Sequence, residues 1–321
     1  MSQSRNEESA LRLRIRTLTA LAYRLGLPEE VLIAESRKAG GYYQPFISIP
    51  KPAPFAKRIL KIKKRVIDNP ADPLKFIQNR IYQRLLQPLL WPEHIYGGVK
   101  GKSLIMNITP HLSANVIVTL DIKSFFPTVT TFQVYNVWSA LLGCSPAIAG
   151  LLTRLTTFER HLPQGASTSS ALANLVLYSL DQPIRDYCRE KGILYTTWID
   201  DLAFSGEESR RVINVAVEAL RNGGFAAPHR KLRIMPTHDR QFLTGLLLNR
   251  QPGILREYVS ATRSGIHKLA SRCVPTSGRE RYVRSIEGRI AYIRMVNPRR
   301  ARPLELNLAS TLEILNRSVR H

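Results

Sequence analysis

The pattern that most restricts the possible folds is a pair of β-rich segments with aspartates at strand ends. The alternation in residues 115–129 predicts a buried strand with Asp121 on one face near its end. Residues 193–206 contain two β-rich runs that meet at Asp200 and Asp201, which predicts a hairpin with both acids at its tip. A sheet containing both segments would gather three carboxylates in one place.

An Asp-Asp pair alone is weak evidence for a site, because turns favour aspartate for local hydrogen bonding. Together with Asp121, however, the pair would form a cluster of like charges, which is costly to bury unless a cation lies between the carboxylates. Oxygen ligands of this kind suit Mg²⁺, which keeps several waters and is completed by substrate phosphates. Two such ions stabilise the attacking and leaving oxygens of phosphoryl transfer, so the pattern indicates a nucleotide polymerase.

The charge balance favours a polyanionic partner. The 321 residues include 47 Lys and Arg against 24 Asp and Glu, a formal net charge of +23. Nucleic acid is the partner that this excess most often indicates, and a basic surface retained only for solubility is the alternative. Apolar residues make up 44% of the chain, enough for a folded core.

Several features predict a cytoplasmic protein without membrane association. No apolar run approaches the roughly 20 residues that span a bilayer, and the polar N-terminus lacks a signal-peptide pattern. The cysteines Cys144, Cys188 and Cys273 are odd in number and widely spaced. They therefore form neither a disulfide framework nor a cysteine metal site.

Basic segments outside the acidic motifs are candidates for phosphate contacts. Residues 51–67 carry seven basic residues and no acidic one. The loop 95–103, IYGGVKGKS, does not fit a phosphate-binding P-loop, because Tyr96 stands where that motif needs glycine. We interpret this loop as a turn that brings Lys100 and Lys102 near a backbone phosphate. The last part of the chain has a basic helical pattern, which predicts a separate helical unit.

Five short motifs follow one another along the chain. They are NITPH at 107–111, DIKSFFP at 121–127, LPQGASTSSALANL at 162–175, WIDD at 198–201 and LTGLLLN at 243–249. In order and spacing they resemble the motifs of bacterial reverse transcriptases, most closely the retron type, over about residues 50–300. The resemblance implies an α+β right-hand polymerase fold with fingers, a ferredoxin-like antiparallel palm and a helical thumb.

The resemblance also implies domain boundaries. An N-terminal helical extension would cover residues 1–34, and the fingers would cover 35–110. The palm with the catalytic aspartates would cover 111–250, and a basic helical thumb would cover 251–321.

By the same resemblance, Asp121 and Asp200 are the main ligands of two magnesium ions, with Asp201 assisting and Ile122 contributing through its backbone. Because consecutive strand residues point to opposite faces, we expect Asp201 to face Asp121 less directly than Asp200 does. Lys231 matches a lysine proposed in related polymerases to protonate the departing pyrophosphate, and a simple phosphate contact is its alternative role.

The resemblance places Phe126, beside Phe125, beneath the sugar of the incoming nucleotide, where its ring would clash with a 2′-hydroxyl and select dNTPs. Gln164 would line the nucleotide pocket, or else be a buried structural glutamine. The candidates to grip the triphosphate are Arg58, Lys64 and Arg65.

Other residues are expected to contact nucleic acid. Thr244 and Gly245 would form the turn that positions the primer end, and Trp198 replaces the usual tyrosine beside the catalytic hairpin. Asn107 and His111 would hold RNA or shape the fold, and a satisfied structural histidine is the alternative for His111. Further expected contacts are Lys100, Lys102, Arg281, Arg284 and Arg289.

The implied function is RNA-directed DNA synthesis on a cognate structured non-coding RNA, giving a short single-stranded DNA in an RNA–DNA hybrid. Retrons prime on a 2′-hydroxyl of that RNA and serve in anti-phage defence, with a neighbouring effector or toxin protein. Host RNase H would remove RNA, because the chain has no room for such a domain. The expected partners also include a second copy of the chain in a homo-oligomer. One alternative is a defence enzyme primed from a protein tyrosine such as Tyr42 or Tyr43. The other is a non-catalytic RNA-binding module.

Overall fold

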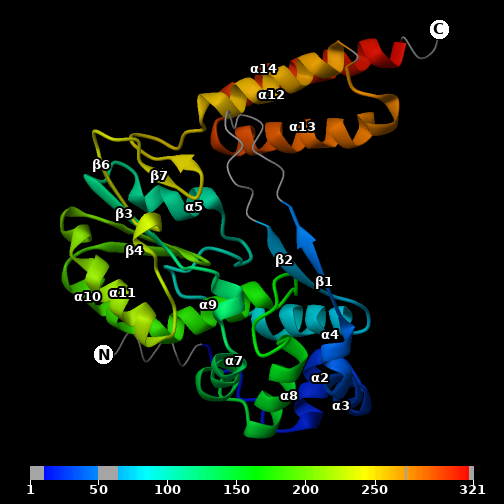
Figure 1. Ribbon diagram of the computed structural model, residues 1–321, viewed down its shortest axis with the longest axis vertical. Coiled ribbons are helices and arrows are strands. Elements are labelled where there is room, and N and C mark those ends of the chain that lie inside the picture. The colour runs from blue at the N-terminus through cyan, green and yellow to red at the C-terminus, as the bar shows by residue number, and fades with distance from the viewer. Residues whose placement is uncertain (1–10, 50–63, 272, 318–321) are drawn as a thin grey trace.

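The computed structural model describes residues 11–49, 64–271 and 273–317. In Figure 1 a sheet with packed helices lies at the left, helices from the N-terminal part lie below, and the C-terminal helices lie across the top. The strands pair in antiparallel fashion in every sheet. This combination of helices and antiparallel sheets confirms the predicted α+β class.

The central sheet has four strands in the order β4-β5-β3-β6. They are β3 (Val116–Asp121), β4 (Leu194–Trp198), β5 (Asp201–Ser205) and β6 (Arg233–Pro236). The predicted buried strand is β3. The predicted hairpin is β4 and β5, joined by a two-residue turn in which Ile199 has a φ of +59°. The two acid-bearing segments are therefore neighbours in one sheet.

Alternation along the strands assigns the two faces of this sheet to different hydrophobic clusters. Val118 and Leu120 belong to the larger cluster, whereas Ile117 belongs to the smaller one. The helices that supply the larger cluster at this face are α9 (Ser169–Leu180), α10 (Gln182–Glu190) and α11 (Val212–Asn222). Because strand residues two apart share a face, Asp121 lies on the side of Ile117 and Thr119, away from these helices.

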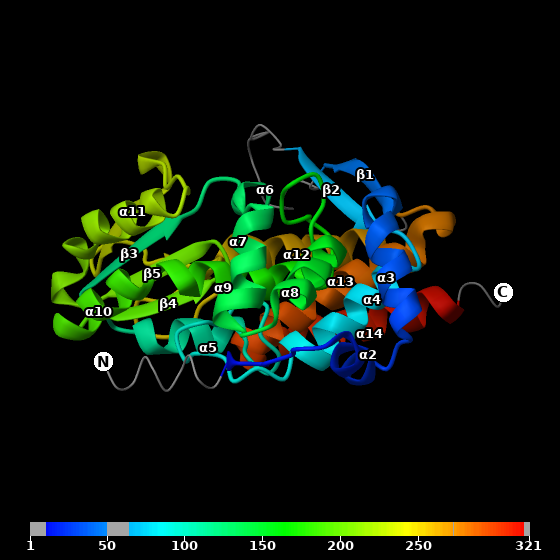
Figure 2. The ribbon, with the colours of Figure 1, turned by 90° about the horizontal axis from the view of Figure 1, so that it is seen from below.

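The N-terminal part is mainly helical. The helices α2 (Leu18–Leu25) and α3 (Glu29–Lys38) are separated by Gly26, whose φ of +64° ends α2. The strands β1 (Tyr43–Ser48) and β2 (Arg65–Pro70) pair as an antiparallel two-stranded sheet. The other elements of this part are η1 (Ala39–Tyr42), α4 (Leu74–Ile81), η2 (Tyr82–Leu86), α5 (Leu104–Ile108), η3 (Thr109–His111), α6 (Phe125–Thr128), α7 (Thr131–Asn136), η4 (Val137–Leu141) and α8 (Pro146–Thr156). In Figure 2, α7 and α8 lie between the sheet and the helices α3 and α4.

The C-terminal part forms the predicted helical unit. Its helices are α12 (Arg256–Ala270), α13 (Thr276–Val296) and α14 (Pro298–Arg317). Ile266, Ile290 and Leu304, one from each helix, are buried in the smaller hydrophobic cluster. Before this unit come η5 (Glu207–Arg210), η6 (His229–Lys231), β7 (Phe242–Leu243) and β8 (Leu246–Leu247). Among the helices that the structure describes, none has the length and apolar character needed to cross a membrane.

Candidate active site

The acids meet at one end of the central sheet. Asp121 ends β3, Asp201 begins β5, and the two are direct cross-strand partners. Side chains of directly opposite residues lie on the same face of an antiparallel pair. The backbone N–H of Ile122 donates to the carbonyl oxygen of Asp200 at 3.0 Å, which ties the end of β3 to the hairpin turn. The predicted convergence of the three acid-bearing positions is therefore observed.

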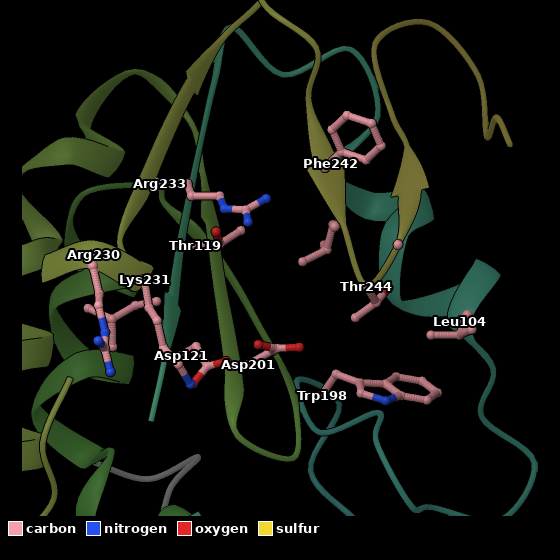
Figure 3. A pocket seen from close by; sticks show the side chains of 13 residues that line it. Leu104, Thr119, Asp121, Trp198, Asp201, Arg230, Lys231, Arg233, Phe242 and Thr244 are labelled. Atoms are coloured by element: carbon pink, nitrogen blue, oxygen red, sulfur yellow. The ribbon is translucent and has the colours of Figure 1, made fainter. Parts of the chain in front are cut away.

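A cleft of about 650 Å³ opens on this face of the sheet (Figure 3). It is lined by Leu104, Thr119, Leu120, Asp121, Trp198, Asp201, Arg230, Lys231, Arg233, Phe242, Leu243, Thr244 and Gly245. The residues among them that the sequence predicted for the site are Asp121, Trp198, Asp201, Lys231, Thr244 and Gly245. Stretches far apart in the chain thus contribute to one cleft.

The strand register bears on the expectation about the two hairpin aspartates, and which of their side chains faces Asp121 more directly stays a prediction. Asp201, which the alternation argument expected to face Asp121 less directly, is its cross-strand partner and lines the cleft. Asp200 lies in the turn and is not among the lining residues. This pairing of Asp121 with Asp201 follows from the strand register, which spacing within one segment does not determine. How the three carboxylates share metal binding stays a prediction.

The donor set suits a divalent cation. Burial and, to a smaller degree, the charge of Asp200 raise the pKa of Asp201 to about 6, while Arg233 opposes the shift. A cation would relieve this accumulation of negative charge, and carboxylates with the backbone carbonyl of Ile122 offer only oxygen ligands, which Mg²⁺ prefers. Within the described ranges, no three Asp, Glu, His or Cys side chains form a closed metal cluster. An ion bound here would therefore need further ligands, such as water or substrate phosphates.

Lys231 lies beside the acids at the end of the central sheet. It ends η6, and its Nζ forms an ion pair with the carboxylate of Asp121. Arg230 and Arg233 also line the cleft. The sequence prediction missed both arginines, although the basic run around Lys231 was an available signal.

The turn between β7 and β8 forms another wall of the cleft. Thr244 and Gly245 are its two central residues, with φ of +48° and +86°. Two-residue hairpin turns favour positive φ, but a β-branched residue rarely adopts it. The buried Thr244 hydroxyl has no hydrogen-bond partner within the described chain. The predicted turn at Thr244 and Gly245 is therefore confirmed. The nearby Phe242 also lines the cleft, but the sequence did not predict it as a site residue, because a lone phenylalanine matches no chemical motif.

Three residues expected to bind the nucleotide, Phe125, Phe126 and Gln164, lie outside the cleft lining. Phe125 is only 2% exposed and packs edge-on against Phe225, so its predicted nucleotide contact is replaced by a place in the core. Phe126 is half-buried, and its ring centroid lies 6.1 Å from that of Phe125. Gln164 is half-buried as well. Neither Phe126 nor Gln164 lines the cleft, so their roles stay predictions.

Asn107 and His111 do not form a nucleic-acid surface, because both side chains are fully buried. The His111 ring bonds Ser205 Oγ through Nδ1 at 2.7 Å and Thr196 Oγ1 through Nε2 at 2.8 Å. Burial lowers the pKa of His111 to about 4, so the imidazole is neutral near pH 7. His111 thus shapes the fold by joining η3 to two strands of the sheet. The buried amide of Asn107 has no hydrogen-bond partner in the described part of the chain.

The two lysines of the 95–103 loop differ. Lys100 is exposed and available for the predicted phosphate contact. Lys102 donates through Nζ to the carbonyl oxygens of Pro92, Glu93 and Ile95 at 2.9, 3.1 and 2.6 Å. Burial also lowers the pKa of Lys102. These bonds give Lys102 a structural role, and its nucleic-acid contact stays a prediction.

The remaining predicted basic residues that the structure describes are not among the residues lining the cleft. Arg58 lies outside the described residues, while Lys64 precedes β2 and Arg65 begins it, both exposed. The three arginines expected in the thumb are on α13, where Arg284 also pairs with Glu280 at 2.6 Å. They are Arg281, Arg284 and Arg289.

Comparisons with known proteins identify the family of the chain. The family model described as reverse transcriptase (RNA-dependent DNA polymerase) matches residues 49–245, so the chain belongs to the reverse transcriptase family. Reverse transcriptases share a polymerase fold and use divalent metal ions, typically Mg²⁺.

Within this family, several similar curated proteins are named as retron enzymes. Retron Ec86 reverse transcriptase of Escherichia coli is 29% identical over 263 residues, 78% of this chain and 80% of that protein. Retron Mx65 reverse transcriptase of Myxococcus xanthus is 32% identical over 260 residues, 75% of this chain but only 60% of the relative. These matches confirm the predicted retron-type reverse transcriptase and its RNA-directed DNA polymerase activity.

Proposed function

We propose that this enzyme copies part of a cognate structured non-coding RNA into a short single-stranded DNA held in an RNA–DNA hybrid, within a retron anti-phage defence system. The observation that carries the proposal is the pairing of Asp121 with Asp201 at the floor of a cleft that also holds Lys231. The net charge of +23 supports a nucleic-acid partner. The curated relatives, which are named as retron enzymes, support the biological setting.

In this proposal the polymerase fold has the right-hand layout. Residues 1–34 form the helical extension and 35–110 the fingers. Residues 111–250 form the palm, and 251–321 form the thumb. The four-stranded antiparallel sheet and the three C-terminal helices support the last two assignments.

The proposed reaction is the attack of a sugar hydroxyl on the α-phosphorus of a dNTP, with departure of pyrophosphate. The catalytic residues would promote this reaction. Asp121, Asp200 and Asp201, with the Ile122 carbonyl, would hold two magnesium ions. When bound, such ions supply electrostatic stabilisation to the attacking and leaving oxygens. Lys231, which pairs with Asp121, would give a proton to the departing pyrophosphate or contact its charge.

Substrate selection is assigned to residues around the cleft. Phe126 would exclude the 2′-hydroxyl, and Gln164 would contact the incoming nucleotide. Thr244 and Gly245 would position the primer end, and Trp198 would pack against it. The exposed cations Lys100, Arg281 and Arg284 and the half-buried Arg289 would contact backbone phosphates. The fingers residues Arg58, Lys64 and Arg65 would contribute to the same surface.

Priming from a 2′-hydroxyl of the RNA is favoured over priming from either named tyrosine. Tyr43 is 7% exposed and accepts a hydrogen bond from Gln78 at 2.9 Å. Tyr42 donates its hydroxyl proton to Glu35. An effector protein, host RNase H and self-association complete the proposed partners.

The decisive experiment is to purify the enzyme with its nucleic acid, sequence that nucleic acid, and measure dNTP-dependent synthesis. The wild type should carry one RNA species joined to DNA and should lose synthesis when divalent ions are chelated. A variant with Asp200→Asn and Asp201→Asn should keep the RNA but lose the DNA and phage protection. Asp186→Asn, an exposed change in α10, is the matched control. Unchanged protection by the double variant would favour the non-catalytic module.

A further inference from the structure

A carboxylate in β2 is buried although the hairpin around it is largely open. Asp68 is 5% exposed, whereas Ile47 and Val66 on the same two strands are 60% and 55% exposed. A carboxylate is costly to bury without hydrogen bonds. The partners of Asp68 therefore indicate why an acid stands at this position.

All the side-chain bonds recorded for Asp68 go to the loop that carries Gln164. The backbone N–H of Gln164 donates to Asp68 Oδ2 at 3.2 Å, and the N–H of Asp68 donates to the Gln164 carbonyl at 2.7 Å. His161 Nε2 lies 3.1 Å from the same Oδ2. The Asp68 carboxylate thus binds the loop at both His161 and Gln164. The backbone bond from Asp68 N–H to the Gln164 carbonyl fixes the distance between the loop and β2.

Gly165 gives independent evidence that the loop is seated directly on β2. A β-carbon at Gly165 would lie 3.0 Å from Ile67 Cγ2 and 3.1 Å from the carbonyl oxygen of Asp68. Its φ of +129° is a conformation that other residues rarely adopt. Both the backbone angle and the close approach therefore require glycine beside Asp68.

We propose that Asp68 is a positioning residue that fixes Gln164 relative to the incoming nucleotide by pinning the 161–165 loop to β2. This inference rests on the proposed function, because it assigns Asp68 an effect only through Gln164. It also couples the β1–β2 hairpin to the catalytic sheet, since the loop continues directly into α9. Displacing the loop would misplace Gln164 without touching the aspartates.

The test uses the full-length enzyme with its RNA and compares Asp68→Leu, which removes the acceptor, with Asp68→Asn, which keeps one. Asp68→Leu should raise the KM for dNTP about tenfold while kcat changes less than about threefold. Asp68→Asn should recover most of the loss. Asp186→Leu, in an exposed ion pair with Arg189, should behave as wild type. Gly165→Ala disturbs the same contact from the loop side and should also raise the KM for dNTP. It provides the test if Asp68→Leu does not fold.

A double-mutant cycle separates positioning from general stability. If Asp68 acts through Gln164, adding Asp68→Leu to Gln164→Ala should raise KM no further. Additive effects, or a KM within about twofold of wild type for both Asp68→Leu and Gly165→Ala, would overturn the proposal. Hydrogen exchange of residues 161–168 is a readout that needs no synthesis and should be faster in Asp68→Leu, and equal exchange would also overturn it. Absence of synthesis by the wild type would instead contradict the proposed function.

Discussion

A β-carbon on Gly97 would lie 2.6 Å from the backbone nitrogen of Ile199, the first residue of the turn between β4 and β5. The same carbon would lie 2.8 Å from the carbonyl carbon of Trp198. Around this contact, Tyr96 N–H donates to the Thr197 carbonyl at 2.9 Å, and Asn174 Nδ2 donates to the Gly97 carbonyl at 2.7 Å. The loop 95–103 therefore supports the β4–β5 hairpin and is itself held by Asn174 of α9.

Gly97→Ala should lower DNA synthesis at least tenfold, a loss of at least about 1.4 kcal/mol of transition-state stabilisation. The added methyl group meets backbone atoms, so the turn that carries Asp200 must shift. Primer extension at saturating dNTP, with circular dichroism to confirm folding, checks this. Gly40→Ala is the control, because nothing lies within 4 Å of its β-carbon position. Equal activity of both variants would contradict the support role.

Lys102→Met should destabilise the protein by about 1–3 kcal/mol, because three carbonyl oxygens lose a charged donor. Lys100→Met, at an exposed position, should leave stability within about 0.5 kcal/mol. Lys100→Met should instead remove one phosphate contact. The slope of the logarithm of the RNA-binding constant against the logarithm of salt concentration should then become shallower by about one. Urea unfolding and RNA titration at several salt concentrations distinguish the two roles, and the reverse pattern would make Lys102 the phosphate contact.

Stability should fall as the pH is lowered from 6.5 towards 4, in part because of His111. Its pKa is about 4 in the folded protein against 6.5 in the unfolded chain, so the unfolded state binds an additional proton in this window. Above pH 6.5 both states are neutral and this contribution vanishes. The loss should reach roughly 3 kcal/mol near pH 4. Urea unfolding of wild type and His111→Gln measures the difference, and identical pH profiles would show that His111 does not titrate in this way.

Trp198→Tyr should keep turnover within about threefold, or about 0.7 kcal/mol, because Asp121 and Asp201 are untouched. The length distribution of the products should nevertheless change, because a hydroxyl replaces the indole N–H in the cleft wall. Extension of one primer on a long template, resolved by length, is the measurement. Trp198→Phe, without either polar group, is the companion variant. Identical product lengths in all three enzymes would remove Trp198 from the primer contact.

Local patterns predicted the elements of the site well. The alternation in β3 and the acids of the hairpin predicted where Asp121 and Asp200 lie in their segments, and the motif around Thr244 predicted its turn. Burial was predicted less well. Phe125 and His111 match family motifs, yet each packs against residues far away in the chain, and no local signal reveals those contacts.

The sequence by itself determined the polymerase family, the strand that ends in Asp121, and the hairpin with two acids, because these follow from short-range periodicity and ordered motifs. Only the tertiary structure decided that Asp201 pairs with Asp121, that Lys102 is tied to carbonyl groups, and that Asp68 holds the Gln164 loop. Each of these depends on register or on contact between distant segments. Such relationships are set when the whole core packs, and residue spacing within one segment does not encode them.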